Sequence, residues 1–180
     1  KMNSRPISEI VKNYRAMFWA ESYNNAVRKF NGYKGSNDKL ELNEAIDLFN
    51  QSVEIDPSEG QTYAILATCY YELGDNESAI ANGKKASELM PNEFQPNITL
   101  GQILSFSGNK EEAIGYIKKA IEIDPTNSNA IRTLATLYYD LGDKEKSVET
   151  FQAAIKMETD KKLKANLYFN LGVLNMQLNN

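Results

Sequence analysis

Apolar residues recur along this chain at intervals of three and four positions, the spacing that places them on one face of a helix. Residues 60–73 show the pattern clearly, with Tyr63, Leu66, Ala67 and Tyr70 at i, i+3, i+4 and i+7. The same spacing recurs in residues 76–89, 94–107, 110–123, 128–141 and 144–157. The pattern therefore predicts paired consecutive helices and an all-α fold.

Glycines followed by a short polar residue interrupt the helical pattern at a fixed interval. The pairs Gly74-Asp75, Gly108-Asn109 and Gly142-Asp143 are 34 residues apart, and so are Pro57, Pro91 and Pro125. Glycine suits the left-handed residue after a helix, and Asp or Asn can cap the helix that follows. Each proline forces the residue before it out of helical geometry. A fixed period of this size indicates one supersecondary unit copied along the chain.

With 34 residues per helix-turn-helix unit, the pattern resembles the tetratricopeptide repeat. In the copy that starts at Gly60, the motif positions hold Tyr63, Leu66, Ala67, Tyr70, Gly74, Ala79, Gly83, Ala86 and Pro91. The small residues of the motif let helix axes approach closely, and the large ones fill the spaces between them. The resemblance implies a right-handed α-solenoid of about four helix-turn-helix repeats plus a C-terminal capping helix, with residues 1–180 as a single array.

Three regular repeats are expected at residues 58–91, 92–125 and 126–159. Residues 1–57 form an atypical first repeat with about 13 residues more than the 34-residue template. We expect the surplus in an inserted loop at residues 31–38, which is either a tolerated surface insertion or part of the binding side. Thr159 stands where the closing proline is expected, which predicts a looser and longer link to the next helix.

Residues 162–178 predict a terminal helix with no second helix to pair with. One of its faces carries leucines at 163, 167, 171, 174 and 178, and another carries Phe169, Val173 and Met176. Two interpretations stay open. The helix caps the last pair, or it is the first half of a further repeat, which predicts an exposed apolar strip and self-association.

The composition argues against a catalytic or metal site. The chain has no histidine and a single cysteine, Cys69, so the commonest general base and metal ligand are both missing. We therefore expect no enzyme activity and no cofactor. The net charge of −4 argues against nucleic acid as the main partner. No apolar run approaches the roughly 20 residues needed to span a bilayer, so membrane insertion is not expected. Location in the cytoplasm, or in the periplasm or outside the cell after removal of a leader, stays open.

The resemblance also implies a concave groove lined by the first helix of each repeat. The residues at the groove positions that we expect to bind a partner are Gln61, Thr68, Tyr71, Gln95, Gln102, Phe106, Asn129, Arg132, Thr136, Tyr139, Phe169, Val173 and Met176. Most are amides, hydroxyls and aromatics, which can bond a peptide backbone and offer apolar area at low entropic cost. The alternative for Ile98 and Phe106 is that they pack against neighbouring helices.

One subtype of the family binds the acidic C-termini of heat-shock chaperones through a clamp of Lys, Asn and Arg side chains. The clamp positions hold Ala64, Thr68, Thr99, Asn129 and Thr133 in one register, and Met17, Glu21, Ile65, Gln95 and Thr99 in the other. Neither register holds a cation to bond a terminal carboxylate. The sequence thus argues against a chaperone C-terminal acidic peptide as the partner.

The sequence favours a non-catalytic scaffold that binds an extended peptide or a helix of another protein in its groove. Two alternatives remain. The chain is an end-to-end self-assembly module, a homo-oligomer through the C-terminal helix, or it is the accessory arm of a larger enzyme or of a secretion or envelope protein.

Overall fold

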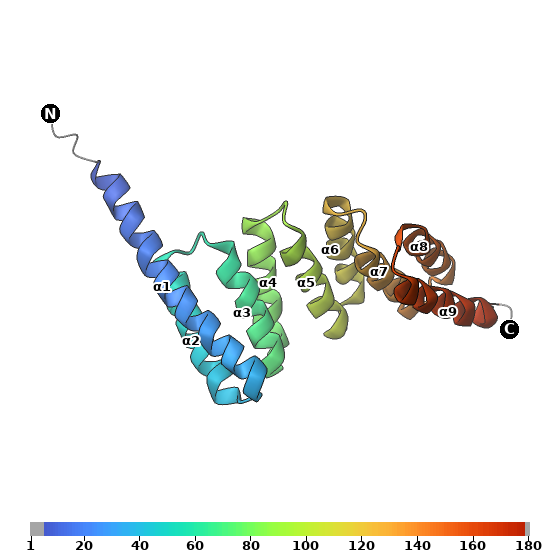
Figure 1. Cartoon of the computed structure of the whole chain (residues 1–180), viewed down its shortest axis with the longest axis horizontal. Coiled ribbons are helices and arrows are strands. Elements are labelled where there is room, and N and C mark those ends of the chain that lie inside the picture. The colour runs from blue at the N-terminus through green and yellow to red at the C-terminus, as the bar shows by residue number, and fades with distance from the viewer. Residues whose placement is uncertain (1–5, 179–180) are drawn as a thin grey trace. The chain divides into compact units, whose positions relative to one another are not determined.

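The structure, a computed structural model, describes residues 6–178, and side chains as far as residue 176. The described residues form helices and short links, without a strand in that range (Figure 1). The helices are α1 (Ile7–Ser36), α2 (Lys39–Ile55), α3 (Gly60–Leu73), α4 (Asn76–Leu89), α5 (Phe94–Phe106), α6 (Lys110–Ile123), α7 (Ser128–Asp140), α8 (Lys144–Met157) and α9 (Lys161–Leu178). The predicted all-α repeat fold is confirmed.

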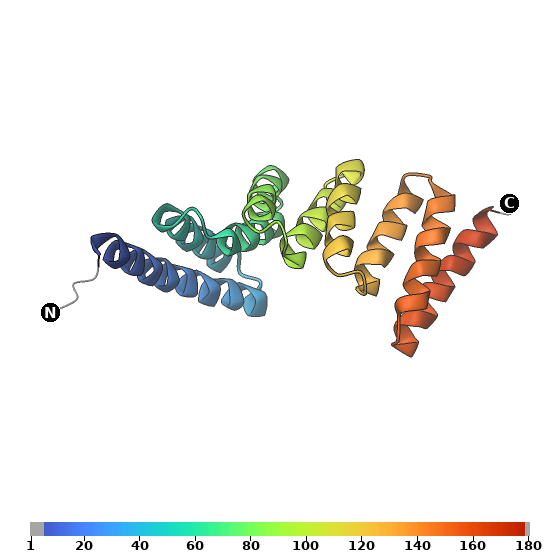
Figure 2. The same ribbon diagram turned by 90° about the horizontal axis from the view of Figure 1, so that it is seen from above.

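Consecutive helices pair as hairpins, α1 with α2, α3 with α4, α5 with α6 and α7 with α8, while α9 packs on α8 (Figure 2). The contacts divide the chain into two compact units, Lys1–Met90 and Pro91–Asn180. We call these the first unit and the second unit. The single continuous array stays a prediction.

The turn inside each regular hairpin has the predicted left-handed glycine, but the predicted cap forms in two of the three turns, because the Asn109 side chain makes no capping hydrogen bond. Gly74, Gly108 and Gly142 have φ values of 88°, 86° and 83°, where a side chain would be strained. The carboxylates of the following residues cap the next helix, since Asp75 accepts from the Ser78 amide at 3.0 Å and Asp143 from the Lys146 amide at 3.2 Å.

The predicted loop at residues 31–38 is wrong, because α1 continues without a break to Ser36. At 30 residues it is more than twice as long as α3, with 14. Its turn into α2 consists of Asn37 and Asp38, which repeat the Gly-Asp signal with asparagine in the left-handed position, at φ 58°. Asparagine tolerates this conformation better than most other non-glycine residues. The surplus residues of the first repeat therefore lengthen its helices.

Gly32 and Gly35 lie in this last turn of α1, and Gly32 has a packing role. A Cβ atom on Gly32 would lie 2.9 Å from the Glu41 carboxylate of α2. Ser36 then fixes the helix end, because the single hydrogen of its hydroxyl is shared between the Gly32 carbonyl, at 3.0 Å, and the Glu41 carboxylate, at 2.6 Å. Gly32 thus allows close approach of α2 rather than flexibility of the chain.

The predicted long link after Thr159 is also wrong. Residues 158–160 join α8 to α9, one residue fewer than the four that join α2 to α3, α4 to α5 and α6 to α7. The buried Glu158 side chain accepts hydrogen bonds from the Ser128 hydroxyl and from the Asp160 amide, the latter at 2.8 Å. Asp160 in turn caps α9 by accepting from the Leu163 amide at 2.8 Å. Side-chain hydrogen bonds replace the closing proline here.

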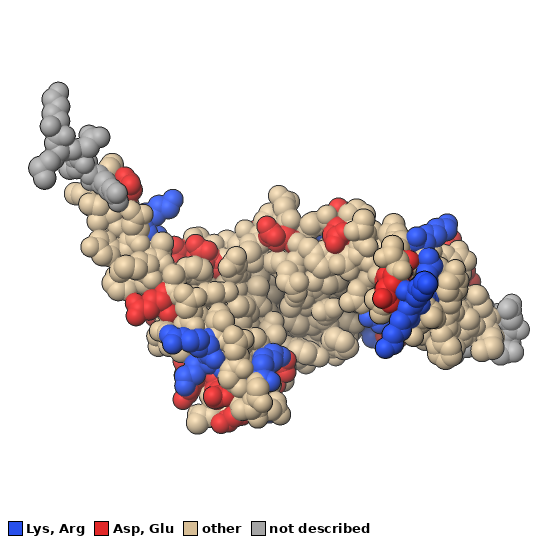
Figure 3. Space-filling model, viewed as in Figure 1, with Lys and Arg blue, Asp and Glu red and all other residues tan. Residues whose placement is uncertain are grey.

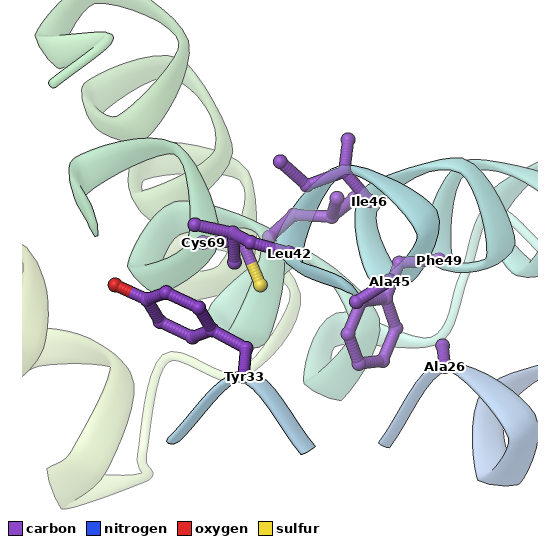
Figure 4. Packing of buried hydrophobic residues seen from close by; sticks show 8 residues of the cluster. Ala26, Tyr33, Leu42, Ala45, Ile46, Phe49 and Cys69 are labelled. Carbon is purple, nitrogen blue, oxygen red and sulfur yellow. The ribbon is translucent and has the colours of Figure 1, made fainter. Parts of the chain in front are cut away.

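The core of the first unit lies between α1, α2 and α3 (Figure 4). Phe49 is fully buried and meets the Tyr23 ring edge-on, with centroids 5.7 Å apart. Tyr33 and Cys69 close the other end of the cluster. Burial raises the pKa of the Cys69 thiol to about 12, which makes it an inert packing residue.

The second unit has its own core beneath α9, with Ile131, Phe151 and Ala154 covered by Leu167 and Leu174. The leucine stripe of α9 is thus partly buried, although Leu163 is exposed and Leu178 lies outside the residues whose side chains are described. The other predicted apolar face is exposed at Phe169 and Met176. The terminal helix therefore covers the core and also presents an apolar strip.

Candidate functional site

Helix α7 presents a polar and aromatic stripe on the face opposite its buried side. The Asn127 side chain caps α7 by accepting from the Ala130 amide at 3.1 Å, and Ile131, Ala135 and Tyr138 point into the core. Arg132, Thr136 and Tyr139 follow at intervals of four and three, so they share the outer face. Two hollows flank this stripe, and we call the stripe and both hollows together the α7 groove.

The first hollow, of about 290 Å³, lies between α7 and α9 and reaches down to α8. Its walls are mainly apolar and aromatic, and they comprise Thr136, Tyr139, Phe151, Phe169, Asn170, Val173 and Leu174. Phe169 is 71% exposed, an unusual state for a large apolar residue beside a cavity. Four of the predicted groove residues therefore meet here.

The second hollow, of about 440 Å³, lies between α5 and α7. Its lining is more polar and comprises Gln102, Ser105, Phe106, Lys110, Arg132, Thr133, Thr136, Leu137 and Asp140. Lys110 pairs with Asp140 at 2.8 Å, which joins the start of α6 to the end of α7. Phe106 is 74% exposed, whereas Ile98 is buried.

A third, smaller hollow of about 150 Å³ lies where α7 and α9 begin, with Asn129, Arg132 and Asn166 on its rim. Arg132 donates to the Asn129 side-chain oxygen at 3.2 Å through Nε. Glu158 lies in the wall, and its hydrogen bond from Ser128 lowers the pKa of its carboxyl. The lining of this hollow is more polar than that of the first one, and several of its side chains already bond to one another.

The remaining predicted residues lie elsewhere. Gln61, Thr68 and Tyr71 are on α3 in the first unit, where the Thr68 hydroxyl donates to the Ala64 carbonyl at 3.3 Å. Gln95 donates to the Thr99 hydroxyl at 3.0 Å, within α5. Met176 is exposed one turn beyond the apolar hollow. A binding role for these residues stays a prediction.

Phe151, Asn170 and Lys110 line the hollows, yet they are absent from the predicted set. The repeat template assigns groove positions to first helices alone, so it omits Phe151 of α8 and Lys110 of α6. Asn170 follows Asn166 by four residues, which is one helical turn, and this spacing could have identified it.

Charge is mixed on the molecular face in Figure 3, where acidic and basic side chains alternate near the α1–α2 turn. Within residues 6–178, no three or more His, Cys, Asp or Glu side chains are grouped so that they could hold a metal ion. No helix in the same range has the length and apolar character needed to span a bilayer.

Comparison with known proteins gives two sequence matches to models of the tetratricopeptide repeat, over residues 60–93 and 107–167. No curated protein sequence matches the chain.

Among solved structures, the chain is similar to a crystal structure of MamA, with 22% identity and a TM-score of 0.71 over 78% of this chain and 81% of that chain. It is also similar to MamA 41-end from Desulfovibrio magneticus RS-1, with 18% identity and a TM-score of 0.71 over 86% of this chain and 85% of that one. At these identities the likeness concerns the fold.

Proposed function

The chain belongs to the tetratricopeptide repeat family, and we propose that it is a scaffold that binds a segment of another protein in the α7 groove. Proteins of this fold use an extended concave surface to bind other proteins. One observation carries the proposal. The apolar hollow between α7 and α9 is bordered by Phe169, a large aromatic side chain that leaves most of its surface in water.

The dimensions of the apolar hollow favour one anchoring side chain of a partner. Its volume of about 290 Å³ is at the lower end of the roughly 300–1,000 Å³ of small-molecule sites. Protein interfaces commonly depend on a few large apolar anchors in such pockets, with polar groups around them. We therefore propose that a Leu, Met or aromatic side chain of the partner enters between Tyr139 and Phe169.

The polar groups beside the hollow suit the backbone around that anchor. Asn170 offers an amide, and Thr136 and Gln102 follow towards the second hollow. An amide both donates and accepts, so it can bond either an N–H or a C=O of an extended segment. An extended peptide or one face of a helix fits this combination of anchor and polar border.

The test uses a display library of random peptides selected on the wild-type chain. We expect enriched peptides to carry a large apolar residue and to lose at least about tenfold in affinity on Phe169→Ala, the change that a lost anchor contact of roughly 1.4 kcal/mol produces. Tyr168→Ala is the matched control, because Tyr168 is its exposed neighbour on α9 and does not line the hollow. Equal affinity for the two variants would contradict the proposal.

End-to-end association through α9 is the alternative, favoured by the exposed Tyr168, Phe169 and Met176. The same pair of variants separates the two. Association through α9 predicts a mass that rises with concentration in light scattering and falls on Tyr168→Ala. Peptide binding in the groove predicts no effect of Tyr168→Ala on either measurement.

A further inference from the structure

The first three turns of α1 extend beyond its hairpin partner α2 (Figure 1). Every residue of this overhang, Ile7–Phe18, is exposed, and Ile7 reaches 80%. Half of them are large and apolar, namely Ile7, Ile10, Val11, Tyr14, Met17 and Phe18. Contiguous exposed apolar surface of this kind marks an interaction site more often than scattered exposed residues do.

These apolar residues form a stripe that the α1–α2 hairpin does not use. The buried seam of α1 runs through Trp19, Ala26 and Tyr33. At about 100° per residue, the line through Ile7 and Phe18 is displaced from that seam by roughly 90° around the helix.

The two directions are occupied by different residue types along α1. Along the overhang, the seam direction carries the polar residues Ser8, Lys12 and Arg15. Beyond Phe18, the stripe direction becomes polar at Glu21 and Asn25. The stripe is therefore a separate face, confined to the overhang, and it is not an unfinished part of the internal core.

We propose that this stripe binds the same stripe of a second copy of the chain, in an antiparallel pair related by a two-fold axis. The central residues Ile7, Val11, Tyr14 and Phe18 are spaced by four, three and four positions. This sequence of intervals is the same in both directions. When one helix is reversed, Ile7 meets Phe18 of the second copy and Val11 meets Tyr14, as a two-fold interface requires.

The flanks of the stripe decide between the antiparallel and the parallel arrangement. Ile10 and Met17 lie on one side, and Ser8 and Arg15 on the other. In an antiparallel pair each flank faces the same flank of the other copy. Ile10 then meets Met17 of the second copy, and Arg15 meets Ser8. Parallel helices bring unequal flanks together, which would place each Arg15 guanidinium against Ile10 of the other copy. The antiparallel pair therefore has the matching surfaces.

The overhang is preformed for such a contact. Tyr14 and Phe18 stack along the helix with ring centroids 6.4 Å apart, which gives a continuous aromatic surface. The contact is short, about 18 Å at 1.5 Å per residue, so we expect a weak and concentration-dependent dimer rather than a permanent one. The inference is independent of the α7 groove, which lies in the second unit.

Analytical ultracentrifugation of the full chain tests the dimer. Val11→Asp places a charge in the centre of the stripe, and we expect the dissociation constant to rise at least about tenfold, because both copies then bury a carboxylate. Asn13→Asp is the matched control, with the same charge on the opposite face of the same turn. Thermal unfolding should be unchanged in both variants, since every side chain of the overhang is exposed and none of them lies in the core.

Disulfide trapping tests the direction. The antiparallel pair predicts that Ile7→Cys chains mixed with Phe18→Cys chains form a mixed disulfide, and that Ile7→Cys chains alone do not. Cys69 is buried with its pKa raised to about 12, so it does not compete. A parallel pair would instead cross-link Ile7→Cys to itself and overturn the proposal.

Two further results would also overturn it. A strict monomer at high concentration excludes the dimer. A monomer that binds vesicles of anionic phospholipid, and loses that binding on Val11→Asp but not on Asn13→Asp, assigns the stripe to a membrane surface instead.

Discussion

The two units place the same repeat position in different surroundings. The next-to-last residue of α3 is Glu72, and the last residue of α7, at the equivalent position of its repeat, is Asp140. In the first unit the end of α1 reaches this position, where Tyr33 donates to the Glu72 carboxylate at 3.2 Å and Lys34 pairs with it at 2.5 Å. In the second unit the equivalent carboxylate pairs with Lys110 and borders a hollow of about 440 Å³.

This difference shows how a lengthened helix changes the use of a repeat. Glu72 follows the predicted groove residue Tyr71 on α3, and the last turn of α1 binds its carboxylate, so this position contributes to the stability of the first unit itself. The second unit has no such extension among its described helices, and its equivalent positions border open hollows. Binding is therefore expected on α7 and α9 before α3.

The largest expected effect separates buried from exposed aromatics. Phe49→Ala in the first unit should lower the free energy of unfolding by about 3–5 kcal/mol, because the side chain is fully buried against Tyr23. Phe106→Ala in the second unit should cost less than about 0.5 kcal/mol, since that ring is mostly in water. Urea unfolding followed by circular dichroism measures both, and similar costs would contradict the proposed role of Phe106 as a surface residue.

A smaller effect is expected from two glycines of the second unit. A Cβ atom on Gly101 would lie 2.5 Å from Cδ1 of Ile117, so Gly101→Ala should cost about 1–3 kcal/mol. Gly115→Ala meets nothing within 4 Å and lies inside α6, so it should stabilise by about 0.5–1 kcal/mol. Partial rescue of Gly101→Ala by Ile117→Val in thermal unfolding would confirm the overlap, and its failure would place the strain elsewhere.

The smallest expected effect concerns the ion pair between Lys34 and Glu72 in the first unit. The hydrogen bond from Lys34 lowers the pKa of the Glu72 carboxyl. A lowered pKa stabilises the folded chain above the ordinary glutamate value of about 4.3, and this contribution is lost as the pH falls through the lowered pKa. Lys34→Met should therefore destabilise by less than about 1 kcal/mol at pH 7 and by nearly nothing at about pH 2.

The effect of Lys34→Met is measured as the difference in melting temperature between wild type and variant at the two pH values. The matched change in the second unit is Lys110→Met, which removes the partner of Asp140. A Lys34→Met effect that is the same at both pH values would show that Lys34 acts through its cation–π contact with the Phe30 ring, whose centroid is 5.2 Å from Nζ, rather than through the Glu72 carboxylate.

The sequence predicts the repeat well where backbone chemistry decides the structure. Gly74, Gly108 and Gly142 mark turns because only a left-handed residue closes the hairpin there. Asn37 has the same role, but the glycines before it are typical of a loop in the sequence. Gly32 is in fact needed because Glu41 of another helix approaches it closely. A contact between helices is not visible in a local pattern.

The link at Glu158 and the groove differ from prediction for the same reason. Proline is recognisable by itself, whereas the replacement for it depends on Ser128, which is 30 residues earlier. Four residues that the template names, Thr136, Tyr139, Phe169 and Val173, line one hollow, because repeat position determines the helix face. It omits Phe151, which reaches the hollow from beneath. Whether a residue of a second helix reaches such a hollow depends on how the helices pack, which the repeat pattern does not show.

Because α1 is one unbroken helix, its length determines the direction in which the exposed apolar stripe faces. A flexible loop would leave the overhang free to turn, but a continuous helix fixes its faces relative to the core. Each residue inserted between Phe18 and Trp19 would rotate the outer turns by about 100° and advance them by about 1.5 Å. Seven inserted residues would restore nearly the original direction about 10 Å farther out. A change in the number of residues in α1 can therefore turn the apolar stripe to a new direction without altering any residue of the stripe.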